Sequence, residues 1–231
     1  MLTDWDKLPD QIRTPQVKPY YDALRKRRAS LFIKRVFDLF AAAILLILLA
    51  IPMLIIAVWI KLDSEGPVFY RQERVTKDGK HFRIHKFRTM VVNADRIGTS
   101  VTVGNDRRIT GAGQKLRHLR LDELPQLLDV LSGEMSFVGT RPEAVKYVNQ
   151  YKPEYYATLL LPAGITSEAS IRYKDEDRLL SMADDVDRVY MEQVLPEKMK
   201  WNLQGILGFS LLGEMLTMFR TLKAVLWKNK D

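Results

Sequence analysis

The sequence predicts an α+β fold, namely a mostly helical monotopic membrane protein with a Pro-broken re-entrant membrane helix, a small β-hairpin and interfacial amphipathic helices. Three observations predict it. Residues 39–60 form an uncharged apolar run that contains Pro52, Lys and Arg gather on both flanks of that run, and an alternating apolar and polar pattern follows it at residues 64–90. Helical periodicity returns further along the chain.

The chain of 231 residues is long enough to bury a core, and its parts differ in charge. Residues 18–35 contain seven Lys and Arg but one acidic residue, and residues 61–90 contain eight Lys and Arg but four acidic residues. Residues 91–231 contain nineteen basic and nineteen acidic residues. A nucleic-acid-binding protein would more often spread basic charge over one folded face, so we expect no nucleic-acid partner. The basic flanks suit the anionic headgroups of membrane lipids. The lack of cysteine excludes a disulfide framework and thiolate chemistry.

The first part, residues 1–33, is expected to be an N-terminal extension with a basic amphipathic helix. Three prolines among polar residues predict an extended start over residues 1–19. The pattern of residues 20–35 then predicts one basic amphipathic helix, which suits a membrane surface. The apolar side of this helix would consist of Tyr21, Leu24, Leu31 and Phe32.

The second part, residues 34–62, is the predicted membrane helix. A straight helix over its apolar run would rise roughly 33 Å, enough to cross a bilayer core. Pro52 removes a backbone hydrogen bond and kinks the helix, and the basic flanks place both ends on the cytoplasmic side. We therefore expect the helix to enter the membrane, bend at Ile51 and Pro52, and leave on the same face. A kinked helix that spans the membrane is the alternative. Asp38 follows Lys34 at helical spacing, so these two charges should pair at the membrane boundary.

The third part, residues 63–231, is expected to be a cytosolic and interfacial domain. Alternating residues on both sides of the turn Lys77-Asp78-Gly79 predict a β-hairpin. Periodicity predicts a helix within residues 114–135 whose core-facing stripe includes Leu127, Leu128 and Leu131, and "SFVGTRPE" predicts a short strand and a loop. Further helices are predicted over residues 147–161, ended by "PAGIT", over residues 175–200, and over an amphipathic tail at residues 201–227.

Two adjacent carboxylates, Asp122 and Glu123, are the strongest candidates for chemistry. One interpretation is a helix start, since carboxylates favour the first turn of a helix and Pro125 is tolerated there. The other is a nucleophile, because a carboxylate attacks a phosphoryl group when cations or a metal offset the charge. The three histidines lack the spacing of a zinc site, and the sequence contains no Walker motif and no G-x-S-x-G motif. Cations near the pair in the sequence are Lys115, Arg117, Arg120 and Arg141.

Several motifs occur in one order along the chain. They are "KRVFDLF" before the Pro-broken run, then "GPVFYRQERV", "FRIHKFRTM", "LRHLRLDELPQLLDVLSGEMSFVGTRPE" and "LPAGIT". Together they resemble the bacterial sugar transferase family, the monotopic polyprenyl-phosphate phosphoglycosyl transferases, strongly over about residues 31–170 and loosely elsewhere. The resemblance is to the small members that consist of the catalytic core only.

The resemblance implies an enzyme that moves a sugar-1-phosphate from a UDP-sugar to undecaprenyl phosphate and releases UMP. This would be the first membrane step of a bacterial polysaccharide, O-antigen or glycoconjugate pathway, at the cytoplasmic face of the inner membrane, with downstream glycosyltransferases as further partners. By similarity, Asp122 is the nucleophile that forms a covalent phosphosugar intermediate and also a ligand of Mg²⁺, and Glu123 holds the dyad and the metal surroundings in place. Substrate or phosphate binding falls by similarity to Arg117, Arg141, Lys86, Arg88 and Glu143.

The chain departs from the common family pattern at three places. Ile51 stands where many members have Ser before the helix-breaking proline, and Glu214 stands where Asp is expected. After "PAGIT" the chain continues with "SEASIRYKDED" in place of Gly-Trp-Ala-Gln, so the sugar preference of the common branch does not carry over. Two rival functions are a membrane-bound phosphatase or pyrophosphatase, and a non-catalytic membrane scaffold for glycan assembly.

Overall fold

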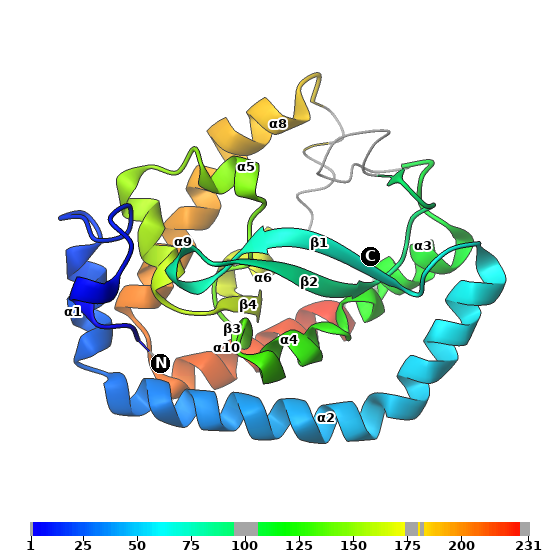
Figure 1. The fold of residues 1–231 in the computed structure, drawn as a ribbon, viewed down its shortest axis with the longest axis horizontal. Coiled ribbons are helices and arrows are strands. Elements are labelled where there is room, and N and C mark those ends of the chain that lie inside the picture. The colour runs from blue at the N-terminus through cyan, green and yellow to red at the C-terminus, as the bar shows by residue number, and fades with distance from the viewer. Residues whose placement is uncertain (1, 95–105, 174–179, 181–182, 227–231) are drawn as a thin grey trace.

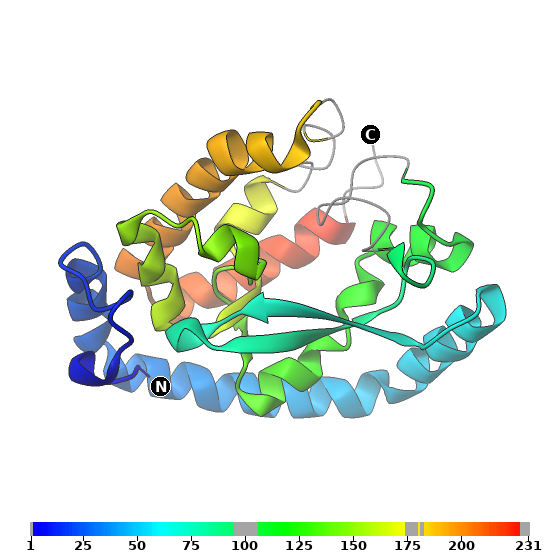
Figure 2. The same ribbon diagram turned by 45° about the horizontal axis from the view of Figure 1, so that its top comes forward.

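The long helix α2 (Arg28–Asp63) forms the base of the molecule, and the other elements lie along one side of it (Figure 1). The computed structural model describes residues 2–94, 106–173, 180 and 183–226. Figure 2 shows the hairpin above α2, with helices of the C-terminal half above the hairpin. The predicted mostly helical α+β architecture is therefore confirmed in its coarse form. Those helices include α8 (Val186–Val189) and α9 (Leu195–Leu207).

Helix α2 continues through Pro52, and its second half turns up towards α3 (Gly111–His118), as Figures 1 and 2 both show. Proline is the usual cause of such a bend because it has no N–H to donate to the preceding turn. The inner side of the helix is buried at Ala42, Ile56 and Ile60, which pack against the domain. The helix therefore follows the body of the protein along its length.

The outer side of α2 is apolar and exposed. Among the described residues, α2 is the one helix that is long and apolar enough to cross a membrane, and 11% of its most apolar 18-residue window is buried. The core helix of a soluble protein would bury most of such a window, and large exposed apolar surfaces of this kind mark membrane or protein interaction sites. Whether the helix re-enters or spans stays a prediction. The exposed apolar side chains include Phe40, Ile44, Ile47, Leu48, Ile51, Leu54, Ile55 and Leu62.

The prediction of one amphipathic helix over residues 20–35 is wrong. This stretch divides between α1 (Lys18–Arg25) and the first turns of α2, because Arg27 leaves the helical conformation at φ −116° and ψ 24°. The Arg27 guanidinium donates hydrogen bonds to the backbone oxygens of Leu207, at 3.2 Å, and Phe209, which ties this break to the end of α9. Of the predicted apolar side, Phe32 is exposed, whereas the residues buried in a core shared with α9 are Tyr21, Leu24 and Leu31.

The predicted β-hairpin is confirmed. Strand β1 (Phe69–Val75) pairs antiparallel with β2 (His81–Phe87). The turn holds Asp78 at φ 57° and Gly79 at φ 74°, a left-handed backbone that Asp and Gly adopt more readily than most residues. At the open end of the hairpin, Phe87 packs with Ile56 and Ile60 of α2. The hairpin is thus fixed to the second half of the long helix.

A parallel pair of strands lies beside the hairpin, and one of these two strands was predicted. Strand β3 (Met135–Val138) confirms the strand expected in "SFVG", and it pairs with β4 (Ala163–Thr166). The "PAGIT" segment, predicted only to end a helix, supplies β4. A Cβ added to Gly164 would collide with the backbone of Gly139, so the two chains approach closely where only glycine fits.

The predicted helix over residues 147–161 is wrong in its extent. The structure has α5 (Val145–Val148) and a separate 3-10 helix (Pro153–Leu160). Lys152, the residue before Pro153, has ψ 151°, which is the extended conformation that a following proline favours. The proline therefore divides the segment.

Helix α4 (Gln126–Ser132) packs its buried side against α2 and β2. Leu127 and Val130 are buried there with Ala42 and Phe82. The predicted core-facing stripe holds for Leu127 but not for Leu128 and Leu131, which are exposed. A helix of only seven residues buries one narrow side, so the leucines next to that side remain outside.

The C-terminal region is helical, as predicted, but in more pieces. Part of the helix predicted over residues 175–200 lies outside the described residues, and a π-helical turn (Tyr190–Val194) leads into α9. The amphipathic tail breaks at Gly208 into α9 and α10 (Leu211–Leu226). Helix α10 is apolar on an exposed side, which confirms the predicted amphipathic character, and its place at a membrane interface stays a prediction. Its exposed apolar residues are Leu212, Met215, Leu216, Phe219 and Leu222.

Lys34 joins α2 to α10. Its ammonium group bonds the carboxylate of Glu214 and lies 3.8 Å from Asp38, which confirms the predicted Lys34–Asp38 pair. Asp38 is buried and accepts a hydrogen bond of 2.7 Å from the hydroxyl of Ser136 in β3. Burial raises the pKa of Glu214, and the charge of Lys34 offsets part of that rise. This polar cluster holds the first half of the apolar helix to the domain.

Candidate active site

Asp122 and Glu123 lie in a single 3-10 turn, Leu121–Glu123, between α3 and α4. Arg120, directly before the turn, has the left-handed backbone at φ 53° and ψ 25°, which is uncommon for a residue with a side chain. Such strained backbone clusters at functional sites. The helix-start interpretation holds only in part, because α4 begins after Pro125 and the two carboxylates precede it.

Glu123 is enclosed by cations. Its carboxylate accepts hydrogen bonds from both terminal nitrogens of Arg141, one of them at 3.3 Å, and from Nζ of Lys86 at 3.4 Å. Arg120 contributes a third cation, with its nearest nitrogen 4.0 Å away. Burial alone would raise the pKa of Glu123, but the charges of Arg141 and Lys86 and the Arg141 hydrogen bond hold that pKa well below its usual range. These surroundings therefore favour the ionised form of Glu123, which pairs with the cations around it.

The pKa of Asp122 is shifted in the opposite direction from that of Glu123. Burial raises the pKa of Asp122, and the neighbouring charge of Glu123 raises it further, while Lys86, Arg117 and Arg141 offset part of the rise. Two adjacent carboxylates whose environments separate their pKa values are typical of sites in which the two groups have different tasks. A carboxylate of raised pKa is the more basic of the two and hence the better nucleophile.

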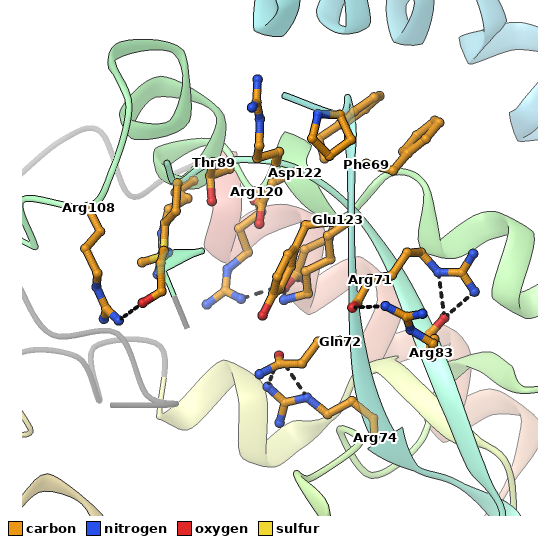
Figure 3. A pocket seen from close by; sticks show the side chains of 18 of the residues that line it. Phe69, Arg71, Gln72, Arg74, Arg83, Thr89, Arg108, Arg120, Asp122 and Glu123 are labelled. Carbon is orange, nitrogen blue, oxygen red and sulfur yellow. Dashed lines mark hydrogen bonds and ion pairs between the residues drawn. The ribbon is translucent and has the colours of Figure 1, made fainter. Parts of the chain in front are cut away.

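Both carboxylates line a pocket of about 560 Å³, a volume in the range of small-molecule sites. Figure 3 shows Asp122 and Glu123 near its centre, with Arg120 beside them and Thr89 and Phe69 towards the top of the view. The hairpin, the loop after β2, the turn before α4, α6 (Glu168–Arg172) and α9 all contribute to the lining. The pocket is strongly basic, which suits a phosphorylated ligand.

The structure gathers most of the predicted phosphate-binding residues around the dyad. Arg117, Arg141 and Lys86 come from α3, the loop after β3 and the end of β2, and all three line the pocket. Burial lowers the pKa of Lys86, although Glu123 and Asp122 favour its charged form. These three cations could bind phosphate oxygens next to Asp122.

Glu143 lies behind the pocket wall. It is buried and accepts a hydrogen bond of 2.6 Å from the Tyr190 hydroxyl, with Nζ of Lys198 at 3.9 Å. These contacts favour a structural role for Glu143, as a carboxylate that holds the Arg141 loop to α9. Its predicted contact with substrate stays a prediction.

Arg88 reaches the pocket lining, but its guanidinium is bound to the end of α2. It donates hydrogen bonds to the backbone oxygens of Ser64, at 2.7 Å, Ile60, at 3.4 Å, and Glu65. Helix ends leave such carbonyl groups without partners, and a buried arginine satisfies several of them at once. Phosphate binding by Arg88 stays a prediction, and its contacts favour a structural role.

We expect Arg88→Met to lower the free energy of unfolding by roughly 3 kcal/mol, because three backbone carbonyl groups at the C-terminal end of α2 lose a buried, charged donor. Chemical denaturation of the purified protein in detergent measures this. Arg13→Met, which changes an arginine on the exposed surface, should cost under about 0.5 kcal/mol. Equal costs for the two variants would show that the Arg88 contacts do not hold α2.

The sequence interpretation missed the residues that β1 contributes. Tyr70, Gln72 and Arg74 alternate with exposed residues along β1 and line the pocket, and Tyr70 lies opposite Lys86 in the strand register. Period-two alternation would have placed all three on the same face as Lys86 once the hairpin was assumed. Further lining residues that were missed are Thr89, Arg108, Ser170, Tyr173 and Lys198.

Within the parts of the chain that the structure describes, no group of three or more His, Cys, Asp or Glu side chains lies together as a metal site. Mg²⁺ is commonly bound by one or two carboxylates, with substrate phosphates completing its coordination. Asp122 and Glu123 fit this mode, and Glu123 is engaged by Arg141 and Lys86. His81 and His85 lie on strand β2 of the hairpin, and Nδ1 of His85 is 2.6 Å from the buried carboxylate of Asp129.

Known proteins are similar to this chain over most of its length. The model of the family described as "Bacterial sugar transferase" matches residues 29–228. A protein of Aeromonas hydrophila named UDP-N-acetylgalactosamine-undecaprenyl-phosphate N-acetylgalactosaminephosphotransferase is 37% identical over 198 residues, which cover 84% of this chain and 44% of the relative. The UDP-glucose:undecaprenyl-phosphate glucose-1-phosphate transferase of Escherichia coli (strain K12) is 40% identical over 166 residues, 70% of this chain and 35% of the relative.

The chain thus spans less than half the length of these two relatives. It spans nearly all of the exopolysaccharide production protein PSS of Rhizobium leguminosarum bv. phaseoli, to which it is 35% identical over 207 residues, 87% of this chain and 98% of the relative. The family model and these identities confirm the resemblance drawn from the motifs. The chain belongs to the bacterial sugar transferase family.

Proposed function

We propose that this protein transfers a sugar-1-phosphate from a UDP-sugar to undecaprenyl phosphate and releases UMP. The observation that supports it best is the Asp122–Glu123 pair, set in a basic pocket on a domain whose base is an exposed apolar helix. Relatives named for transfer of N-acetylgalactosamine phosphate and glucose-1-phosphate to undecaprenyl phosphate support the same reaction. A lipid phosphate is confined to the membrane surface and a nucleotide sugar to the cytosol, so the proposed reaction requires the pocket to receive both.

The first step is attack by a carboxylate oxygen of Asp122 on the β-phosphorus of the donor. The bond from that phosphorus to the oxygen bridging the two phosphates breaks, and UMP leaves with that oxygen and its electron pair. Arg117, Arg141 and Lys86 stabilise the negative charge that develops on the phosphate oxygens. The product is an acyl phosphate that joins the sugar phosphate to Asp122.

The second step is attack by a phosphate oxygen of undecaprenyl phosphate on the same phosphorus. The bond between that phosphorus and the Asp122 oxygen breaks, and the Asp122 carboxylate is restored. Glu123 remains ionised throughout because Arg141 and Lys86 hold its pKa low, so it keeps both cations in place for each step. Mg²⁺, held by Asp122 together with substrate phosphates, would supply further charge neutralisation when bound.

The apolar outer side of α2 would sink into the cytoplasmic leaflet, with the domain above it in the cytosol. Both ends of α2 connect to the same body, along which the helix curves, and this arrangement supports re-entrance over a span (Figure 1). The exposed leucines and Phe219 of α10 would lie at the same interface. This placement would make the reaction the first step of a bacterial glycan pathway at the inner membrane, ahead of downstream glycosyltransferases.

We expect an N-terminal cysteine to react only from the cytoplasmic side. Because the native chain has no cysteine, Gln11→Cys introduces a single exposed thiol. Labelling whole cells with a membrane-impermeant maleimide should leave it unmodified, and lysis should make it reactive. Labelling in intact cells would mean that α2 spans the membrane.

The function is tested by product analysis with purified protein, undecaprenyl phosphate and a panel of UDP-sugars. A transferase releases UMP and forms a lipid-linked sugar in equal amounts, and both depend on the lipid at steady state. A phosphatase or pyrophosphatase would release UMP repeatedly without lipid and form no lipid-linked sugar. A scaffold would release none, and it would still support glycan assembly in cells after loss of both Asp122 and Glu123.

A further inference from the structure

One wall of the pocket combines uncharged hydrogen-bonding groups with two cations that other protein groups engage. It consists of Gln72 and Arg74 of β1, Ser170 and Tyr173 at α6, and Lys198 of α9, and we call it the α6 wall. Figure 3 shows Gln72 and Arg74 on the opposite side of Glu123 from Thr89. Gln72 and Arg74 of the α6 wall therefore lie away from the part of the pocket where Thr89 and Phe69 lie.

The two cations of the α6 wall are engaged by other protein groups. Arg74 donates to the side-chain oxygen of Gln72 at 2.6 and 3.2 Å and to the backbone oxygen of Pro142 at 3.4 Å. Lys198 donates to the Tyr190 hydroxyl at 3.3 Å and lies 3.9 Å from the Glu143 carboxylate. With the Gln72 oxygen held by Arg74, its amide NH₂ is the group left to meet a ligand. The wall thus offers that amide and the hydroxyls of Ser170 and Tyr173.

The α6 wall connects directly to the dyad. Arg141 bonds Glu123, and Glu143, two residues further along, accepts the hydrogen bond from Tyr190 and pairs with Lys198. The wall and the dyad are therefore joined through one short loop. A group that stays bonded to the attacked phosphorus must remain in the pocket through both steps, and the α6 wall lines the same pocket as Asp122.

The hydroxyl-bearing part of the wall is held in place by its neighbours. The Ser167 hydroxyl caps α6 by accepting a hydrogen bond of 3.0 Å from the backbone N–H of Ser170, and the two hydroxyl oxygens are 3.1 Å apart. On the same helix, Arg172 stacks 3.7 Å from the ring centre of Trp201 of α9. Specific recognition requires this kind of preorganised support, because a mobile group discriminates poorly between similar ligands.

We propose that the α6 wall holds the sugar of the donor and that Ser170 and Tyr173 select which UDP-sugar is used. The inference rests on the proposed function, since the sugar is the part of the donor that remains on Asp122 when UMP leaves. Arg117, Arg141 and Lys86 serve the phosphates, which all donors share, whereas hydroxyl and amide groups distinguish one sugar hydroxyl or acetamido group from another. A tyrosine ring also provides an apolar face against which a pyranose ring packs.

The test compares four donors, UDP-glucose, UDP-galactose, UDP-N-acetylglucosamine and UDP-N-acetylgalactosamine, with the full chain and undecaprenyl phosphate. The kcat/KM of UMP release is measured for the wild type, Tyr173→Phe and Ser170→Ala. Each variant should lower the ratio between the best and the second-best donor by about tenfold, since a hydrogen bond that favours one sugar is lost. Inhibition by UMP should change by less than about twofold, because UMP carries no sugar at this position. Tyr20→Phe, in the N-terminal core outside the pocket, is the matched control and should leave all ratios unchanged.

Unchanged donor ratios in both variants would overturn the inference. A parallel weakening of UMP inhibition would also overturn it, because the wall would then contact uridine. The donor ratios of the two single variants are interpreted separately, so if one variant fails to fold, the other still tests the inference. A wild type that releases no UMP from any donor would contradict the proposed function instead. In that case the wall is tested by calorimetric binding of the same four donors, where loss of the wild type's preference in the variants supports the inference and retention overturns it.

Discussion

Replacing Asp122 with Asn is expected to lower UMP release by about 10³-fold or more, because an amide cannot form the acyl phosphate. The same change should leave the temperature of unfolding unchanged or raise it. Burial and the charge of Glu123 raise the pKa of Asp122, so the folded protein disfavours the ionised form, and a neutral side chain of equal size removes that cost at neutral pH. UMP release and the temperature of unfolding are both measured on one preparation of the variant. The expected result is loss of turnover with retained stability.

Asp10→Asn is the matched control for this result. Asp10 has a side chain that is 93% exposed and pairs only with Arg13 among the described residues, so its replacement should change neither turnover nor stability. Retained UMP release in the Asp122 variant would remove Asp122 from the role of nucleophile. A large fall in unfolding temperature would show instead that its carboxylate stabilises the turn before α4.

Replacing Arg141 with Met is the second large effect, and it should lower kcat by about 10²-fold through loss of a positioned donor at the reacting phosphate. Arg141 also supplies the two-pronged bond to Glu123, so its loss should raise the pKa of that carboxylate towards its usual range. Glu123 would then hold Lys86 less firmly. Steady-state kinetics with varied UDP-sugar measures the loss.

Arg141→Lys separates charge from geometry. Lysine keeps the positive charge but cannot make the paired hydrogen bonds of a guanidinium, so it should recover only part of the lost rate. Arg13→Met, the same truncation at the exposed surface, should leave kcat unchanged. Equal kcat values in Arg141→Met and Arg13→Met would exclude Arg141 from both phosphate binding and support of Glu123.

Sequence patterns predicted those elements that depend on interactions between residues near one another in the chain. The apolar run with Pro52 predicted α2, and the alternation around Lys77-Asp78-Gly79 predicted the hairpin, because neither needs a distant partner to be recognised. The pairing of Lys34 with Asp38 was predicted for the same reason, since both lie on one helix. The adjacent carboxylates and the cations that now line one pocket were also visible in the sequence.

Contacts between distant segments were not predictable in this way. Strand β4 forms because Gly164 allows "PAGIT" to pair closely with β3. The residues of "PAGIT" alone do not identify β3 as the strand with which they pair. The break at Arg27 depends on carbonyl groups of residues 207 and 209, far along the chain. The resemblance implied phosphate binding by Arg88, which stays a prediction, but the sequence did not predict its three backbone acceptors at the end of α2. The α6 wall combines β1, α6 and α9, so it becomes visible only in the folded chain.

The most direct test of the account is a search for the covalent intermediate on Asp122. Purified protein is mixed with a UDP-sugar that supports turnover, without undecaprenyl phosphate, and is analysed by intact-protein and peptide mass spectrometry. The account predicts a mass increase equal to one sugar phosphate on the peptide that contains Asp122, release of UMP equal to the modified fraction, and loss of the adduct when undecaprenyl phosphate is added. Unmodified protein together with full lipid-dependent turnover, or an adduct on another residue that persists in Asp122→Asn, would contradict it.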